Sequence, residues 1–178
     1  MPIISSKLWK QLNNRMFKII LSVFLFLSGN CLCGQVSQPQ KQISTLKFAG
    51  EYAYGSSAEK EEVGFASIYA ESDSTILFYL DLNAGSPSLS MGAIYGRAKI
   101  KNATGLFATR IGSSEDSCQF SFKFKSNKLI LQTLNGQYNC GFGHRVFVDG
   151  TFKRISKKNP AYFLNQETEK IYFKELKL

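Results

Sequence analysis

Histidine and tryptophan are nearly absent from this chain of 178 residues, since each occurs once, as His144 and Trp9. Cysteine occurs four times, and no CxxC motif is present. A transition-metal site needs several histidine or cysteine ligands, and most acid–base catalysis at neutral pH uses histidine. We therefore expect no metal, no cofactor and no enzyme activity.

Long apolar runs are also missing, since none approaches the roughly 20 residues of a membrane-spanning helix. The run that stands out covers residues 19–27, is interrupted by one serine, follows Lys18 and leads into small and polar residues up to Gly34. A charged start, a short apolar centre and a small-residue exit are typical of a secretory signal peptide, whereas a buried helix is the alternative. We predict a signal peptide over residues 1–34, with Met16 as a second candidate for the initiator.

The predicted signal peptide places the mature chain in the periplasm or outside the cell, with no membrane-spanning segment. Lipid attachment at Cys31 is a minor alternative, because the residues before that cysteine fit a lipoprotein motif poorly. The following residues, 35–45, are polar and are predicted to be a flexible lead-in.

From Leu46 onward, apolar and polar residues alternate with a period of two. Phe120, Phe122 and Phe124, for example, are separated by Ser121 and Lys123. This period indicates antiparallel strands with one buried face, and glycine, serine and asparagine mark turns between them. We predict eight strands, at residues 47–54, 63–70, 75–83, 91–101, 105–111, 117–125, 128–134 and 145–154.

Eight antiparallel strands with short turns suit a small closed barrel or a sandwich. Gly50 and Gly150 each stand two residues before an aromatic residue, in the first and last predicted strands. Glycine permits the sharp bend needed where those strands would pair, although it also commonly begins a strand after a turn. We predict an all-β fold, an eight-stranded closed barrel over residues 46–155 with a short C-terminal hairpin or lid over residues 156–178.

Two cysteines, Cys118 and Cys140, remain after the signal peptide. In an exported protein an even pair indicates a disulfide, and this spacing does not suit a redox or metal site. Residues 117–125 and 128–134 are predicted to form a hairpin whose open end carries Cys118. The chain leaves the hairpin at that same end, so Cys140 can return to it.

The stretch from Cys140 to Gly143 reads Cys-Gly-Phe-Gly, and residues 149–152 read Asp-Gly-Thr-Phe. With Cys118 upstream, it resembles a group of small, secreted, uncharacterised bacterial barrel proteins of the Bacteroidota type. That resemblance covers the last third of the chain and implies no catalytic residues. The predicted barrel is also distantly similar to calycins, the lipocalin and avidin group, although Tyr52 stands where a lipocalin has tryptophan.

Two surfaces carry the candidate functional residues. A recognition loop is predicted at Gly141, Phe142, Gly143, His144 and Arg145, with a purely structural turn as the alternative. A basic face is predicted at Arg97, Lys99, Lys101, Lys123 and Lys125, extended by Lys128 and by a third group at Arg145, Lys153, Arg154, Lys157 and Lys158. Converging cations attract anionic polymers or acidic proteins, although a solvated strand face is the simpler interpretation.

Three functions compete. We expect a monomeric, exported, non-enzymatic binding or inhibitory protein whose partner is a secreted protein, an anionic glycan or a surface polymer, and not nucleic acid. The alternative is a calycin-like carrier of a small apolar ligand, suggested by 15 phenylalanines and 8 tyrosines. A hydrolase or isomerase would depend on His144, with Asp149 and Ser113, Ser114 or Ser117 nearby in sequence, but no Gly-x-Ser-x-Gly motif supports it.

Overall fold

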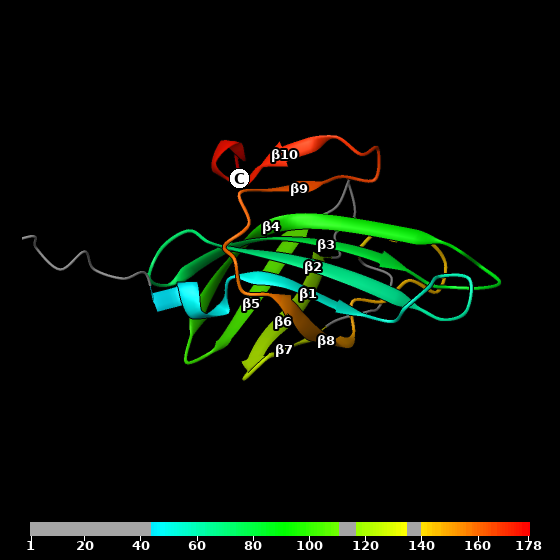
Figure 1. Cartoon of the computed structure of the whole chain (residues 1–178), viewed down its shortest axis with the longest axis horizontal. Coiled ribbons are helices and arrows are strands. Elements are labelled where there is room, and N and C mark those ends of the chain that lie inside the picture. Colours follow the sequence, from blue (N-terminus) through cyan, green and yellow to red (C-terminus); the bar gives the residue numbers. More distant parts are fainter. Residues whose placement is uncertain (1–43, 111–116, 135–139) are drawn as a thin grey trace, which may run out of the picture. The chain divides into compact units, whose positions relative to one another are not determined.

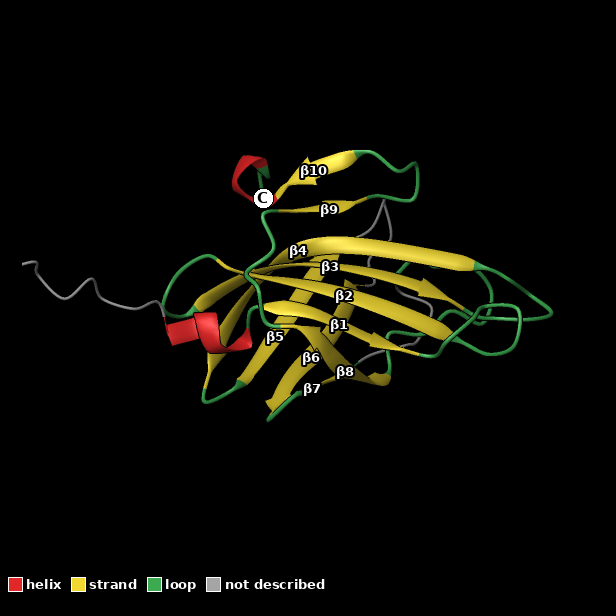
Figure 2. Ribbon diagram, viewed as in Figure 1, coloured by secondary structure: helices red, strands yellow, loops and turns green. Residues whose placement is uncertain are grey.

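The computed structural model describes residues 44–110, 117–134 and 140–178, so the predicted signal peptide and residues 35–43 lie outside the described part (Figure 1). Eight antiparallel strands form a closed barrel in chain order, and the first strand pairs with the last (Figure 2). This confirms the all-β, eight-stranded closed barrel. The strands are β1 (Gly50–Tyr54), β2 (Val63–Ala70), β3 (Thr75–Asn83), β4 (Met91–Lys101), β5 (Thr104–Arg110), β6 (Ser117–Lys125), β7 (Lys128–Thr133) and β8 (Gly150–Ser156).

The N-terminal boundary of the barrel differs from the prediction. Residues Ser44–Phe48 form a 3-10 helix, η1, and β1 begins only at Gly50. Thr45, which was assigned to a flexible lead-in, is buried because η1 packs against the barrel. Gly50 has a φ of 141°, and a Cβ atom there would collide with the carbonyl oxygen of Ser156 on β8. The glycine is therefore needed where the first and last strands meet.

The interior of the barrel is packed with the protein's own aromatic side chains. The ring centroid of Phe78 lies 4.9 Å from that of Phe107, 5.7 Å from that of Phe120 and 4.9 Å from that of Phe122. Edge contacts of this kind add stability beyond the burial of area. The alternation that predicted β6 is thus explained, because its phenylalanines point inward and its lysines outward.

The C-terminal residues form a second, two-stranded sheet outside the barrel. Strands β9 (Tyr162–Leu164) and β10 (Lys170–Tyr172) are followed by a 3-10 helix, η2 (Phe173–Glu175). Phe163 stacks on Tyr79 with 4.1 Å between ring centroids, and Phe173 stacks on Tyr69 at 5.4 Å. The C-terminal residues thus form a hairpin, one of the two predicted forms, and together with η2 it covers the outer face of β2 and β3.

This position has a physical cause in β3. Leu77 and Tyr79 point outward from the barrel, yet each is 2% exposed, because the hairpin covers them. A strand with apolar residues on both faces needs a layer on each side.

No helix in the described ranges is long and apolar enough to cross a membrane.

Candidate functional site

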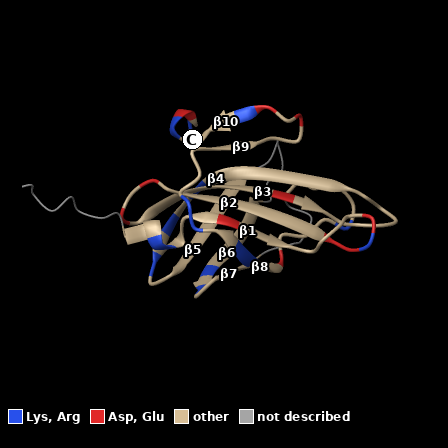
Figure 3. Ribbon diagram, in the orientation of Figure 1, with Lys and Arg blue, Asp and Glu red and all other residues tan. Residues whose placement is uncertain are grey.

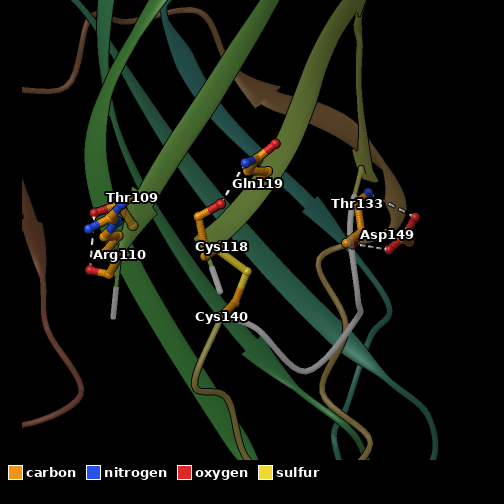
Figure 4. The surroundings of a disulfide bond; sticks show 8 residues. Thr109, Arg110, Cys118, Gln119, Thr133, Cys140 and Asp149 are labelled. Atoms are coloured by element: carbon orange, nitrogen blue, oxygen red, sulfur yellow. Dashed lines mark hydrogen bonds between the residues drawn. A yellow bond between two sulfur atoms is a disulfide. The ribbon is translucent and has the colours of Figure 1, made fainter. Parts of the chain in front are cut away.

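The predicted disulfide is present and joins β6 to the segment that follows β7 (Figure 4). The Cα atoms of Cys118 and Cys140 lie 4.4 Å apart, and both side chains are buried in the barrel core. Because β6 is fixed in the barrel wall, the bond fixes the start of the Cys140–Arg145 loop.

The loop packs against the first residues of β4. The ring of Phe142 lies over Gly92, where a Cβ atom would come within 2.6 Å of it. The backbone N–H of Gly143 donates to the carbonyl oxygen of Met91 at 3.1 Å, and the Ser88 hydroxyl donates to the carbonyl oxygen of His144 at 3.4 Å. These contacts fit a structural closure of this end of the barrel, with the side chains of His144 and Arg145 exposed.

The last strand begins later than the sequence predicted. Residues 145–149 are irregular, and β8 starts at Gly150 instead of Arg145. Val146 and Val148 are both buried, so their alternation imitates a strand although they belong to the loop.

Asp149 is hydrogen-bonded to Thr133, the last residue of β7, as Figure 4 shows. Its carboxylate accepts hydrogen bonds from the backbone N–H of Thr133 at 3.1 Å and from the Thr133 hydroxyl. Ser113 and Ser114 lie outside the described residues. In the described ranges, no group of three or more histidine, cysteine, aspartate or glutamate residues is placed to hold a metal ion.

The basic face draws its lysines from β4, β6, β7 and β8, and Figure 3 colours the lysine and arginine positions blue along the ribbon. Lys99 and Lys101 project from β4, and Lys123 and Lys125 from β6, all of them exposed. Strands β4 to β8 contain no aspartate or glutamate. We call the exposed lysines of this face the basic wall: Lys99, Lys101, Lys123, Lys125, Lys128 and Lys153.

Two arginines that the sequence placed on the basic face have other roles. Arg97 forms an ion pair with Glu71, with 2.7 Å between Nη2 and Oε1, and this carboxylate raises the pKa of Arg97 above its usual value. Arg154 is half-buried, and its guanidinium donates to the carbonyl oxygens of Lys47 and Ala49. Arg97 is therefore exposed, as predicted, but paired with a carboxylate, whereas Arg154 is only half-exposed and bonded to backbone carbonyl oxygens.

Three lysines of the basic wall lie in one row across the barrel. Lys125 pairs directly with Lys128 across β6 and β7, and Lys128 pairs directly with Lys153 across β7 and β8. Like charges directly opposite one another destabilise a sheet. None of the six lysines of the wall forms an ion pair with a carboxylate in the described part of the chain. This row therefore has an electrostatic cost that the fold itself does not require.

A hollow of about 850 Å³ opens in the basic wall where β4 and β5 separate. The ladder between these strands has three pairs and ends at Lys99 with Leu106. Continued in register, Ala98 would pair with Phe107 and Arg97 with Ala108, and neither pair forms. We call this space the β4–β5 hollow; its lining includes Arg97, Lys99, Lys101, Thr104, Leu106, Ala108, Ser121, Lys123 and Gln132.

The two predicted surfaces lie at opposite ends of β4. The loop contacts Met91 and Gly92, the first residues of the strand, and Lys99 and Lys101 stand at its other end. A strand rises about 3.3 Å per residue, so roughly 25–30 Å separates the loop from the lysines. They are therefore two distinct sites.

Sequence reasoning missed the β4–β5 hollow and the opposed lysine row. The alternation did show that these lysines point outward, but it gives no register between neighbouring strands. Only the paired strands show which lysines face one another and where a ladder ends.

Searches of protein-family models, of curated proteins and of solved structures return no match for this chain.

Proposed function

We infer that this chain is an exported, non-enzymatic binding protein that attaches to an anionic surface polymer through the basic wall. The observation that carries the inference is the row Lys125, Lys128 and Lys153 on strands that contain no acidic residue. A multiply charged anion would neutralise cations that have no carboxylate partner among residues 44–110, 117–134 and 140–178.

The composition of the wall favours a polymer over a folded protein as the partner. The centres of protein–protein interfaces are enriched in tyrosine, tryptophan and arginine and depleted in lysine. The wall carries lysine, and the exposed large apolar side chain that pairs with Lys99 is Leu106, an aliphatic residue. Flexible ammonium groups suit carboxylate, sulfate or phosphate groups repeated along a chain.

Two features support export. The sequence begins with a segment typical of a signal peptide, and the Cys118–Cys140 disulfide is of a kind that persists in oxidising compartments. The alternative function, carriage of an apolar ligand inside the barrel, finds less support. The rings around Phe78 occupy the space in which such a ligand would lie.

The test compares two triple variants with equal loss of charge. One removes the row (Lys125→Gln, Lys128→Gln, Lys153→Gln), and the other removes exposed lysines elsewhere (Lys60→Gln, Lys174→Gln, Lys177→Gln). Binding of the mature chain to a heparin-derived oligosaccharide and to oligogalacturonate is measured by titration calorimetry. We expect the row variant to lose about tenfold or more in affinity and the control variant to change little.

Unfolding measurements separate a binding defect from a folding defect. Removing the row relieves like-charge repulsion, so the row variant should be at least as stable as the wild type. The proposal is overturned if neither oligosaccharide binds at low salt. It is also overturned if the row variant and the control variant lose affinity equally.

A further inference from the structure

The β4–β5 hollow offers backbone groups as well as charges. The N–H of Ile100 donates to the carbonyl oxygen of Ser74 beside β3, so even-numbered residues of β4 direct their backbone groups toward β3. The backbone groups of odd-numbered residues, including Arg97, therefore face β5. The pair Arg97 with Ala108 does not form, and both residues line the hollow, so a ligand there can bond to backbone groups that have no partner in the β4–β5 ladder.

Four cross-strand neighbours, separate from the lysine row, line the hollow from β4 to β7. Lys99 pairs with Leu106, Leu106 pairs with Ser121, and Ser121 pairs with Gln132. All four have side chains on the outer face, and Leu106 is 65% exposed in the middle of this set. The Ser121 hydroxyl donates to the backbone carbonyl of Gln132 at 3.4 Å, which leaves its oxygen able to accept. A cation, an apolar surface, a hydroxyl and an amide thus stand side by side.

We propose that the β4–β5 hollow is the subsite for one acidic pyranose unit of the polymer, and this rests on the proposed function. The ammonium groups of Lys99, Lys101 and Lys123 hold the carboxylate or sulfate of that unit. Ser121, Gln132 and the unpaired backbone groups bond to its ring hydroxyls, and Leu106 packs against the C–H face of the ring.

The lining distinguishes a sugar from other anionic chains. A polyphosphate has no hydroxyl donors and no apolar face, so it would leave Leu106 and the acceptor oxygens of Ser121 and the Gln132 side chain unused. A polyglutamate carries carboxylates but no ring hydroxyls. Carboxylated and sulfated sugars share the chemistry that the hollow recognises, since each combines an acid group with a polyhydroxylated ring.

The experiment compares four probes at equal concentration of anionic groups and at one salt concentration. Oligogalacturonate and a heparin-derived oligosaccharide carry sugar rings, whereas poly-L-glutamate and linear polyphosphate do not. Two variants, Leu106→Ala and Gln132→Ala, change the hollow without changing charge. The control is Ile155→Ala, which removes an apolar side chain on β8 that is exposed to a similar extent, 62%.

We expect each hollow variant to weaken binding of at least one of the two oligosaccharides by about three- to tenfold, the effect of lost hydrogen bonds or packing. The same variants should leave polyglutamate and polyphosphate binding unchanged, and Ile155→Ala should change neither class. The sugar that responds more strongly shows whether the carboxylate or the sulfate is preferred.

The subsite is disproved if both oligosaccharides bind no tighter than polyglutamate and the hollow variants change nothing. In that case the triple variant of Lys125, Lys128 and Lys153 would still bind the anionic probes more weakly than the wild type, and the proposed function would stand. If none of the four probes binds at low salt, both the subsite and the proposed function are wrong.

Discussion

Arg154 on the last barrel strand lies over the ring of Tyr52 on the first, with 5.5 Å between the guanidinium carbon and the ring centroid. The Tyr52 hydroxyl donates to the carbonyl oxygen of Phe48 at 2.7 Å. The guanidinium also donates to the carbonyl oxygens of Lys47 and Ala49. These contacts connect both strands of the closure to helix η1, so one side chain joins three elements that are distant in sequence.

Replacing Arg154 by glutamine should therefore loosen the closure. We expect the free energy of unfolding to fall by about 2–4 kcal/mol, because a cation–π contact and two charge-assisted hydrogen bonds to backbone carbonyls are lost. Urea titration measures this loss. Lys153→Gln is the matched control, since Lys153 is the neighbouring residue on β8 but points to solvent. Equal stability of the two variants would contradict the role of Arg154.

Gly92 and Phe142 should show strong coupling in a double-mutant cycle. A Cβ atom at position 92 would lie 2.6 Å from the ring of Phe142, so Gly92→Ala forces the loop away from β4. We expect a loss of about 1–3 kcal/mol in the wild-type background. In the Phe142→Ala background the added methyl group has room, and most of that loss should disappear. Additive effects in urea titration would show that the loop does not pack on β4.

Local periodicity sufficed to predict most of the barrel. The ranges predicted for β2, β3, β4 and β6 agree with the observed strands, because each has apolar residues on its inner face and turn residues at its ends. The start of β8 was predicted wrongly because a second apolar pattern precedes it. Val146 and Val148 alternate as in a strand, but they are buried by the loop that the disulfide holds.

The candidate site was predictable only in part. Outward lysines on β4 and β6 follow from alternation, but their neighbours depend on register. Glu71 reaches Arg97 from 26 residues away and removes it from the free cations. The β4–β5 ladder likewise ends near a tertiary contact. The ring of Phe107 on β5 lies so close to Gly96 on β4 that a Cβ atom there would come within 2.4 Å of it. Such relationships are set by tertiary packing.

Removing the disulfide should affect the loop before the barrel. The double variant Cys118→Ser, Cys140→Ser should lose about 2–4 kcal/mol of unfolding free energy, since the bond closes a loop spanning 22 positions. Hydrogen exchange should accelerate first in residues 140–148, and less in the strands. Alkylation of the unreduced, exported protein should find neither thiol free. Two alkylated cysteines would refute the bond.

Tyr79 is placed to make stability depend on pH in the alkaline range. Its side chain is 2% exposed beneath the C-terminal hairpin, and its hydroxyl has no hydrogen-bond partner in the described part of the chain. Burial, together with the nearby carboxylate of Asp81, raises the pKa of Tyr79 to about 12 from the usual 10.0. Because the unfolded chain releases this proton first, stability from the neutral form is complete below pH 10 and is lost as the pH rises toward 12.

The variant Tyr79→Phe separates this titration from that of the lysines and other tyrosines. Phenylalanine keeps the stacking on Phe163 and removes a buried hydroxyl that lacks a partner, so at pH 7 the variant should be as stable as the wild type or more stable. Between pH 10 and 12 the wild type should lose stability more steeply than the variant, by up to about 1.4 kcal/mol per pH unit. Urea titrations of both proteins at pH 7, 10 and 11 measure the difference. Parallel losses would mean that Tyr79 is solvated and that the hairpin does not cover β3 in solution.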